Sequence, residues 1–129
     1  THPHVIEPVE WVIDEEGNKM LVYYSLGNFV NGTSGTGSGV ANRMVGGMAD
    51  VVLTKNEEGD VVIQSYDAIP LVCHWSQEKI TTYFLSDYTD EMAEQNDILH
   101  QDPEFSLQGC KELVMEVWGK DWKGMENEN

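Results

Sequence analysis

The sequence has few cations, and this shortage limits the functions it can have. Its 129 residues carry seven Lys and Arg against 23 Asp and Glu, which gives a formal net charge of −16. A surface of that sign repels phosphate backbones, so the composition argues against nucleic-acid binding. It equally disfavours contact with any other polyanion, unless a divalent cation changes the local sign.

Cysteines and long apolar runs are also scarce. Cys73 and Cys110 are the two cysteines, with no CxxC and no zinc-type spacing, so we predict two buried free thiols. No apolar run approaches the ~20 residues that a membrane span requires. A signal segment would have to lie before Thr1, so the sequence leaves secretion open.

Two β-hairpins are predicted from the same turn signal. In each, an acidic turn that contains a glycine, Gly17 or Gly59, separates two runs rich in β-branched and aromatic residues. Glycine supplies the positive φ that such turns require. Residues 79–85 are a further strand candidate, and Pro70 predicts an edge or the end of strand pairing.

The last part of the chain changes to helical patterns. A cap at Thr89 or at the aspartate after it predicts a helix through residues 91–101. The Asp-Pro pair at 102–103 predicts a second helix start. An apolar stripe follows from Leu107, and Gly119 is expected to end that helix.

The order of these elements predicts an α+β fold, with antiparallel β-hairpins followed by two helices. Residues 1–86 are expected to be mainly β, residues 87–120 helical, and residues 121–129 a frayed tail. Between the hairpins, residues 31–43 are rich in Gly, Ser and Thr and cannot build a core, so they predict a mobile loop. They match no phosphate-binding motif.

His2 and His4 form the tightest cluster of metal-ligand side chains. Two imidazoles separated by one residue in extended backbone project to the same side, so both can face one metal centre. Zinc, manganese and iron accept imidazole ligands, and nearby carboxylates would complete the shell. The competing interpretation is a flexible chain end. His74 and His100 fit structural positions and receive no ligand role.

Several segments resemble one known family. The stretch HPHVI, with Pro8 and Glu10, followed by VYYSLGNF, resembles the C-terminal half of CapA-type proteins, which are named for poly-γ-glutamate capsule biosynthesis. GGMADVVLTK, QSYDAIP and TTYFLSDYT resemble one branch of that family, so the resemblance covers nearly all of the chain. The family is similar to calcineurin-like metallophosphoesterases, whose four-layer α/β/β/α sandwich holds a dinuclear metal site.

The resemblance implies roles for particular residues. His2 and His4 match a His-x-His motif that gives one ligand to each of two divalent metal ions of the manganese, iron or zinc type. Glu7 stands where the family usually has Gln. The remaining ligand motifs belong to an upstream half, so residues 1–129 are expected to be the C-terminal part of a single CapA-like domain. Alone, this part should be inactive and hold no metal firmly.

Two functions stay open at this point. The first is a metal-dependent phosphoesterase-type hydrolase in the full-length parent, in which Asn28 and Arg43 touch an anionic substrate and the catalytic residues are unassigned. The second is a non-catalytic cell-envelope module that handles polymer or assembles with capsule-synthesis membrane proteins. The resemblance implies the cell surface or the extracellular side of a bacterial membrane for either function.

Overall fold

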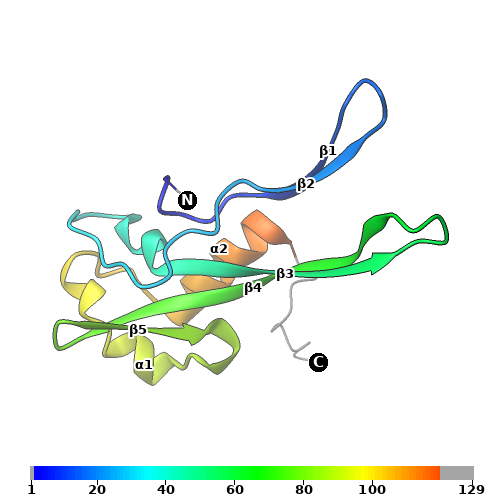
Figure 1. The fold of residues 1–129 in the computed structure, drawn as a ribbon. Helices are drawn as coiled ribbons and strands as arrows, with labels where there is room; N and C mark the ends of the chain where they lie inside the picture. The colour runs from blue at the N-terminus through cyan, green and yellow to red at the C-terminus, as the bar shows by residue number, and fades with distance from the viewer. Residues whose placement is uncertain (1, 120–129) are drawn as a thin grey trace.

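A three-stranded antiparallel sheet runs through the computed structural model, which describes residues 2–119 (Figure 1). Its strands lie in the order β3-β4-β5, and a separate hairpin pairs β1 with β2. The strands are β1 (Val9–Ile13), β2 (Lys19–Tyr23), β3 (Val45–Lys55), β4 (Val61–Ser76) and β5 (Lys79–Phe84). The helical elements are η1 (Val40–Met44), η2 (Leu85–Asp87), α1 (Asp90–Glu94), η3 (Asp97–His100) and α2 (Leu107–Trp118). The predicted α+β fold is confirmed.

Both predicted hairpin turns are present and share one construction. Gly17 has φ 88° and Gly59 has φ 89°, the left-handed region that glycine enters without steric cost. In the first turn the Asp14 carboxylate accepts two backbone N–H bonds, and in the second the Asn56 side chain does the same. The acidic turn signal therefore predicted local structure correctly.

Pro70 does not lie at the edge of the sheet. It pairs with Gly47 inside β4, which is the central strand and continues to Ser76. The ladder between β4 and β5 begins one residue later, at Leu71. One side of Pro70 thus has no strand partner, and an absent N–H is tolerated there. Of the two alternatives, the edge position is wrong, and an end of pairing is found only on the β5 side, because pairing with β3 continues past Pro70 to Val72.

The predicted helix over residues 91–101 is divided into two. Thr89 caps α1 as expected, but α1 stops at Glu94. The Asn96 side chain then accepts a hydrogen bond from the Ile98 N–H and starts η3. An asparagine that caps a new turn cannot also continue the helix before it, which explains the break.

The second helix starts later than the Asp-Pro pair predicts. The Asp102 carboxylate accepts N–H bonds from Ala41 and Glu104, which fixes a turn and a contact with η1 in place of a helix cap. Ser106 caps α2, and Gly119, with φ 82°, ends it as predicted. The predicted frayed tail over residues 121–129 lies outside the described residues.

The core lies where the helical elements pack against the sheet (Figure 1). Among residues 2–119, no helix is long and apolar enough to cross a membrane. We call the helical elements and the part of the sheet that they cover the helical body. Both hairpins extend away from this body, and the strand residues nearest each hairpin turn are exposed (Figure 1). The fully buried side chains include Met44, Leu85, Ile98, Val72 and Val114.

Candidate functional site

His4 adopts a backbone conformation that the sequence did not predict. Residues 2–5 form a turn and bend, not an extended strand, and His4 has φ 62°. Positive φ is uncommon for residues other than glycine, so other contacts must hold His4 there. The contact present is a 2.7 Å hydrogen bond between His4 Nδ1 and Asn28 Oδ1.

The environment of Asn28 determines which ring nitrogen of His4 carries the proton. Asn28 is buried, and its Nδ2 donates a 2.9 Å hydrogen bond to the backbone carbonyl of Arg43. The Asn28 Oδ1 atom can therefore only accept, and His4 Nδ1 must donate to it. In the neutral imidazole, Nε2 then carries a free lone pair on an exposed side chain. A histidine that ligates a metal is typically held in this way through its other nitrogen.

Residues that the sequence did not single out hold Asn28 in place. A Cβ at Gly46 would collide with the carbonyl oxygen of Asn28, so only glycine allows this close backbone approach. The next carbonyl, that of Phe29, accepts hydrogen bonds from the Cys73 thiol, at 3.2 Å, and from the Thr82 hydroxyl. The Gly-Gly pair at 46–47 was the one signal in the sequence that could have indicated this contact.

The chain that follows His4 is anchored on two sides. The Glu7 N–H donates to the Ser25 carbonyl at 3.0 Å, and Trp118 Nε1 donates to the Glu7 carbonyl at 2.9 Å. The Ile6 side chain is buried in the core. These contacts, together with the His4 bond to Asn28, tie the histidine segment (residues 2–7) to the residues that follow β2 and to α2, and they argue against a free chain end.

Arg43 completes a contiguous set with His4 and Asn28. Its Nη1 donates to the Thr33 Oγ1 atom at 3.2 Å, while its backbone carbonyl binds Asn28. Arg43 is exposed, and its other guanidinium N–H groups make no hydrogen bond with the described residues. Three of the four predicted site residues thus lie together. His2 is exposed and makes no hydrogen bond within the part of the chain that the structure describes.

The residues present fit a metal ion in kind but not in number. His4 offers a lone pair at Nε2, and His2 lies two residues away. Within residues 2–119, no group of three or more His, Cys, Asp or Glu side chains is arranged to hold a metal ion. A closed site needs about four ligands, so other ligands would have to come from outside these residues.

Nearby titratable groups do not extend the ligand set. Burial raises the pKa of the Cys73 thiol to about 11, so this side chain is protonated and inert at neutral pH. His74 lies apart from this cluster, with its Nδ1 atom 2.8 Å from the Tyr88 hydroxyl. Burial lowers the His74 pKa, and its packing against Tyr83 and Tyr88 agrees with a structural position.

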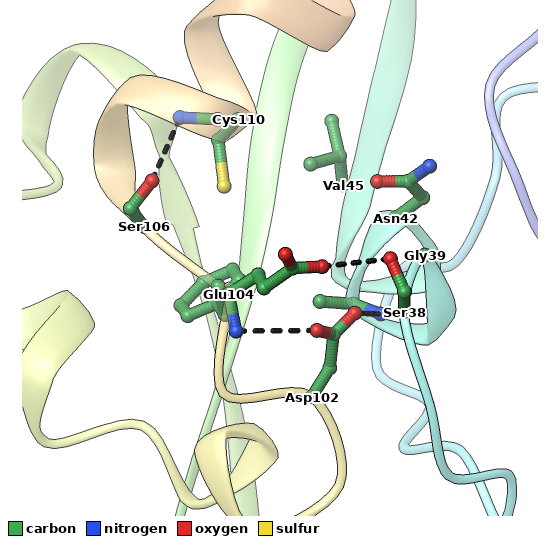
Figure 2. Close-up of a pocket in the computed structure, with 11 residues that line it drawn as sticks. Ser38, Gly39, Asn42, Val45, Asp102, Glu104, Ser106 and Cys110 are labelled. Carbon is green, nitrogen blue, oxygen red and sulfur yellow. Dashed lines mark hydrogen bonds between the residues drawn. The ribbon is translucent and has the colours of Figure 1, made fainter.

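A cavity of about 290 Å³ lies between η1 and the start of α2 (Figure 2). At its rim Ser38 donates to the Glu104 carboxylate, and beneath it the Asp102 carboxylate accepts the Ala41 N–H. None of the predicted site residues lines this cavity, and no Lys or Arg does. The lining residues are Ser38, Gly39, Ala41, Asn42, Val45, Asp102, Glu104, Phe105, Ser106, Gly109 and Cys110.

Comparison with known proteins relates the first part of this chain to a family. Residues 1–33 match the model of a family described as bacterial capsule synthesis protein PGA_cap. No curated protein matches the chain, and no solved structure matches it. The matched segment contains His2, His4, Asn28 and Thr33. The comparison therefore relates the histidine segment and the Asn28 loop of this chain to bacterial capsule synthesis proteins.

Proposed function

We propose that this chain is part of a CapA-like capsule biosynthesis protein, and that His2 and His4 bind divalent metal ions in a phosphoesterase-type hydrolase formed by the full-length parent. The observation that carries the proposal is the hydrogen bond from His4 Nδ1 to the buried Asn28 amide, which leaves Nε2 free to ligate. The family match over residues 1–33 supports the capsule context.

The position of His4 favours a ligand role over a packing role. A positive φ at a histidine costs free energy, about 1 kcal/mol or more. A side chain that only filled the core would be buried in return, whereas His4 is exposed. The strained backbone therefore aims an imidazole with a defined proton position towards solvent, which is useful for binding a metal.

In the proposed site, a bound pair of metal ions would polarise the substrate and lower the pKa of a water molecule. The residues of this chain have other tasks. Asn28 is buried and bonded to protein partners at both Oδ1 and Nδ2, so we assign it to orienting His4 instead of touching the substrate. Arg43, held by Thr33, presents its exposed guanidinium to an anionic group.

The proposed partner for this chemistry is the upstream half of the same domain. Two imidazoles leave a metal shell incomplete, so the chain alone should bind transition metals weakly and show no phosphoesterase turnover. The family resemblance also leads us to propose a location on the outer side of a bacterial membrane.

Calorimetric titration with Mn²⁺ and Zn²⁺ tests this proposal, first on residues 1–129 and then on the full-length parent. We expect weak binding by the chain, and tight binding with aryl-phosphate turnover by the parent. In the parent, His4→Ala should abolish both, whereas His100→Ala, a change at an exposed histidine outside the site, should alter neither. Tight stoichiometric binding or turnover by residues 1–129 alone would contradict the half-site model.

The Asn28 role has its own readout. Replacement of Asn28 by Leu removes the acceptor for His4 Nδ1 without adding charge. Imidazole ¹⁵N shifts should then change from one tautomer to a mixture, and the parent should bind metal about 10–100-fold more weakly. An unchanged tautomer in Asn28→Leu would show that Asn28 does not orient the ring.

A non-catalytic assembly role is the second candidate, and one observation favours it. Large apolar side chains are exposed along both hairpins, where no described residue covers them. Exposed apolar surface of this kind marks sites of protein interaction. A variant of the parent that no longer binds metal but still assembles with its partners would show that assembly does not depend on the metal site.

A further inference from the structure

Two hairpin arms project from the helical body (Figure 1). We define the first arm as residues 9–23 and the second arm as residues 51–66. A ring contact between Trp11 and Tyr66, with centroids 5.7 Å apart, joins the arms near their base. The Tyr23 hydroxyl adds a 2.7 Å hydrogen bond to the Asp67 carbonyl. The arms are therefore two parts of one surface.

Beyond the Trp11–Tyr66 contact, the second arm has exposed apolar side chains on both of its faces. Val51, Val52 and Leu53 are consecutive and all exposed, and successive strand residues point to opposite faces. Leu53 is 60% exposed and Val61 is 65% exposed. A two-stranded ribbon with so little of either face covered is marginally stable in water. The exposed apolar side chains of the two arms are Trp11, Val12, Ile13, Met20, Val51, Val52, Leu53, Val61, Val62 and Tyr66.

The outer edge of β3 is also open along the second arm. Near the body, Gly46 bridges to Gly27 and the Gly47 N–H donates to the Leu26 carbonyl. Beyond that point, residues 51–55 pair with β4 on one side and with no described strand on the other. An open edge beside bare apolar side chains is a template for strand addition.

The charge of the arms distinguishes between the molecules that could cover this surface: a second copy of the chain, a lipid membrane or a segment of another protein. Each arm carries three carboxylates at its tip, Asp14, Glu15 and Glu16 in the first and Glu57, Glu58 and Asp60 in the second, with one lysine each. A second copy of the chain would bring the same carboxylates and a further net charge of −16. Anionic lipid would be repelled in the same way. A strand that carries cations beside apolar side chains would be attracted.

We propose that the arms dock an extended segment of another protein in which apolar and basic side chains alternate. The segment would pair with the open edge of β3 along residues 51–55. Its apolar side chains would all lie on one face and would cover Val51 and Leu53, which share that face of β3. Its cations would meet the carboxylates at the arm tips. This inference is independent of the metal proposal, because no residue of the histidine segment takes part in it.

A labelled twelve-residue peptide of alternating Val and Lys is the probe, and fluorescence anisotropy measures its binding to residues 1–129. Leu53→Thr combined with Val61→Thr removes apolar contact but keeps strand preference, so the arm should remain folded. We expect this pair to weaken binding about tenfold. Glu57→Gln combined with Glu58→Gln should weaken it by several-fold and reduce its salt dependence. The matched control, Glu112→Gln with Glu116→Gln on α2, changes the same number of charges outside the arms and should leave binding unchanged.

Four results would overturn the proposal. The first is no binding of the peptide by the unaltered chain at millimolar concentration. The second is equal weakening by the control pair, which would mean attraction by net charge alone. The third is a dimer of the chain, detected by analytical sedimentation at low peptide concentration and abolished by Leu53→Thr, which would show that a second copy occupies the arms. The fourth is protection of the arm amides from hydrogen exchange in the isolated full-length parent, which would show that the parent covers the arms itself.

Discussion

The helical body and the second hairpin arm are made from the same two strands, yet their valines have opposite environments. In the body, Val45 of β3 is 1% exposed and Val72 of β4 is fully buried. In the arm, Val52 of β3 is 44% exposed and Val61 of β4 is 65% exposed. Residue type and strand are the same, so strand preference alone did not decide burial. The helices pack against one end of the ribbon only.

The two regions also differ in how the backbone is held. In the body, side chains add to the ladder: the Asn96 amide binds the Cys73 carbonyl and the Trp75 N–H. In the second arm, the side-chain hydrogen bonds among the described residues are those within the turn at Asn56. Body and arm should therefore respond very differently to the same kind of substitution.

The largest difference is expected for Gly→Ala changes. At Gly46 a Cβ would meet the carbonyl oxygen of Asn28, so Gly46→Ala must displace backbone and should cost more than about 3 kcal/mol of stability. At Gly59 nothing lies within 4 Å of a new Cβ, and the cost of its positive φ is about 1 kcal/mol. Urea unfolding of both variants measures the contrast. Equal costs would mean that the Asn28 loop can move away freely.

Removal of large apolar side chains should show the next largest contrast. Ile98 is fully buried, so Ile98→Ala leaves a cavity and should cost about 3 kcal/mol. Leu53→Ala removes a mostly exposed side chain and should change stability by less than about 0.5 kcal/mol. Both values come from urea unfolding at one protein concentration. A cost above 2 kcal/mol for Leu53→Ala would show that the arm is buried in solution.

The rates at which thiols react should also differ between the body and the second arm. Cys73 and Cys110 are both buried free thiols, as the sequence predicts, and burial raises their pKa values to about 11 and about 12. At pH 8 a thiol with a pKa near 11 is only about 0.1% ionised, so both should react slowly with an aromatic disulfide. A cysteine placed on the arm by Leu53→Cys should react as fast as a free peptide thiol. Fast modification of the unaltered chain would refute the buried assignment.

The smallest expected effect is a pH dependence that arises in the body. Burial lowers the pKa of His74 below its ordinary value of 6.5, while Asp97 opposes the shift. The folded state therefore favours neutral His74, whose contribution to stability is complete above pH 6.5 and is lost as the pH falls below it. The loss between pH 7.5 and pH 5.5 should shrink in His74→Gln. It should not shrink in His100→Gln, and an equal loss in all three proteins would exclude His74 as the cause.

Local signals predicted the parts of the fold that depend on neighbours in sequence. The glycine turns at Gly17 and Gly59 and the end of α2 at Gly119 were all placed correctly, because each depends on a few adjacent residues. The helix break at Asn96 was missed. The Asn96 cap on the Ile98 N–H is local, but the same side chain also binds β4, more than 20 residues earlier, and those contacts lie outside the window of residues around Asn96.

The candidate site was predictable in its residues but not in its geometry. The spacing of His2 and His4 and the SLGNF segment were visible in the sequence. The left-handed backbone of His4 and its bond to Asn28, 24 residues away, were not. The position of Asn28 in turn depends on the absence of a side chain at Gly46, and an absent atom leaves no pattern of hydrophobicity or charge to detect.

The hydrogen bond from Trp118 to the Glu7 carbonyl has a consequence for how the protein is made. The two residues are separated by 111 positions, and α2 comes last among the described elements. A ribosome releases Glu7 well before Trp118, and this carbonyl cannot meet its donor until Trp118 has also left the exit tunnel. The histidine segment is therefore completed only after Trp118 has emerged, and a nascent chain that stops before Trp118 would carry His4 without this anchor.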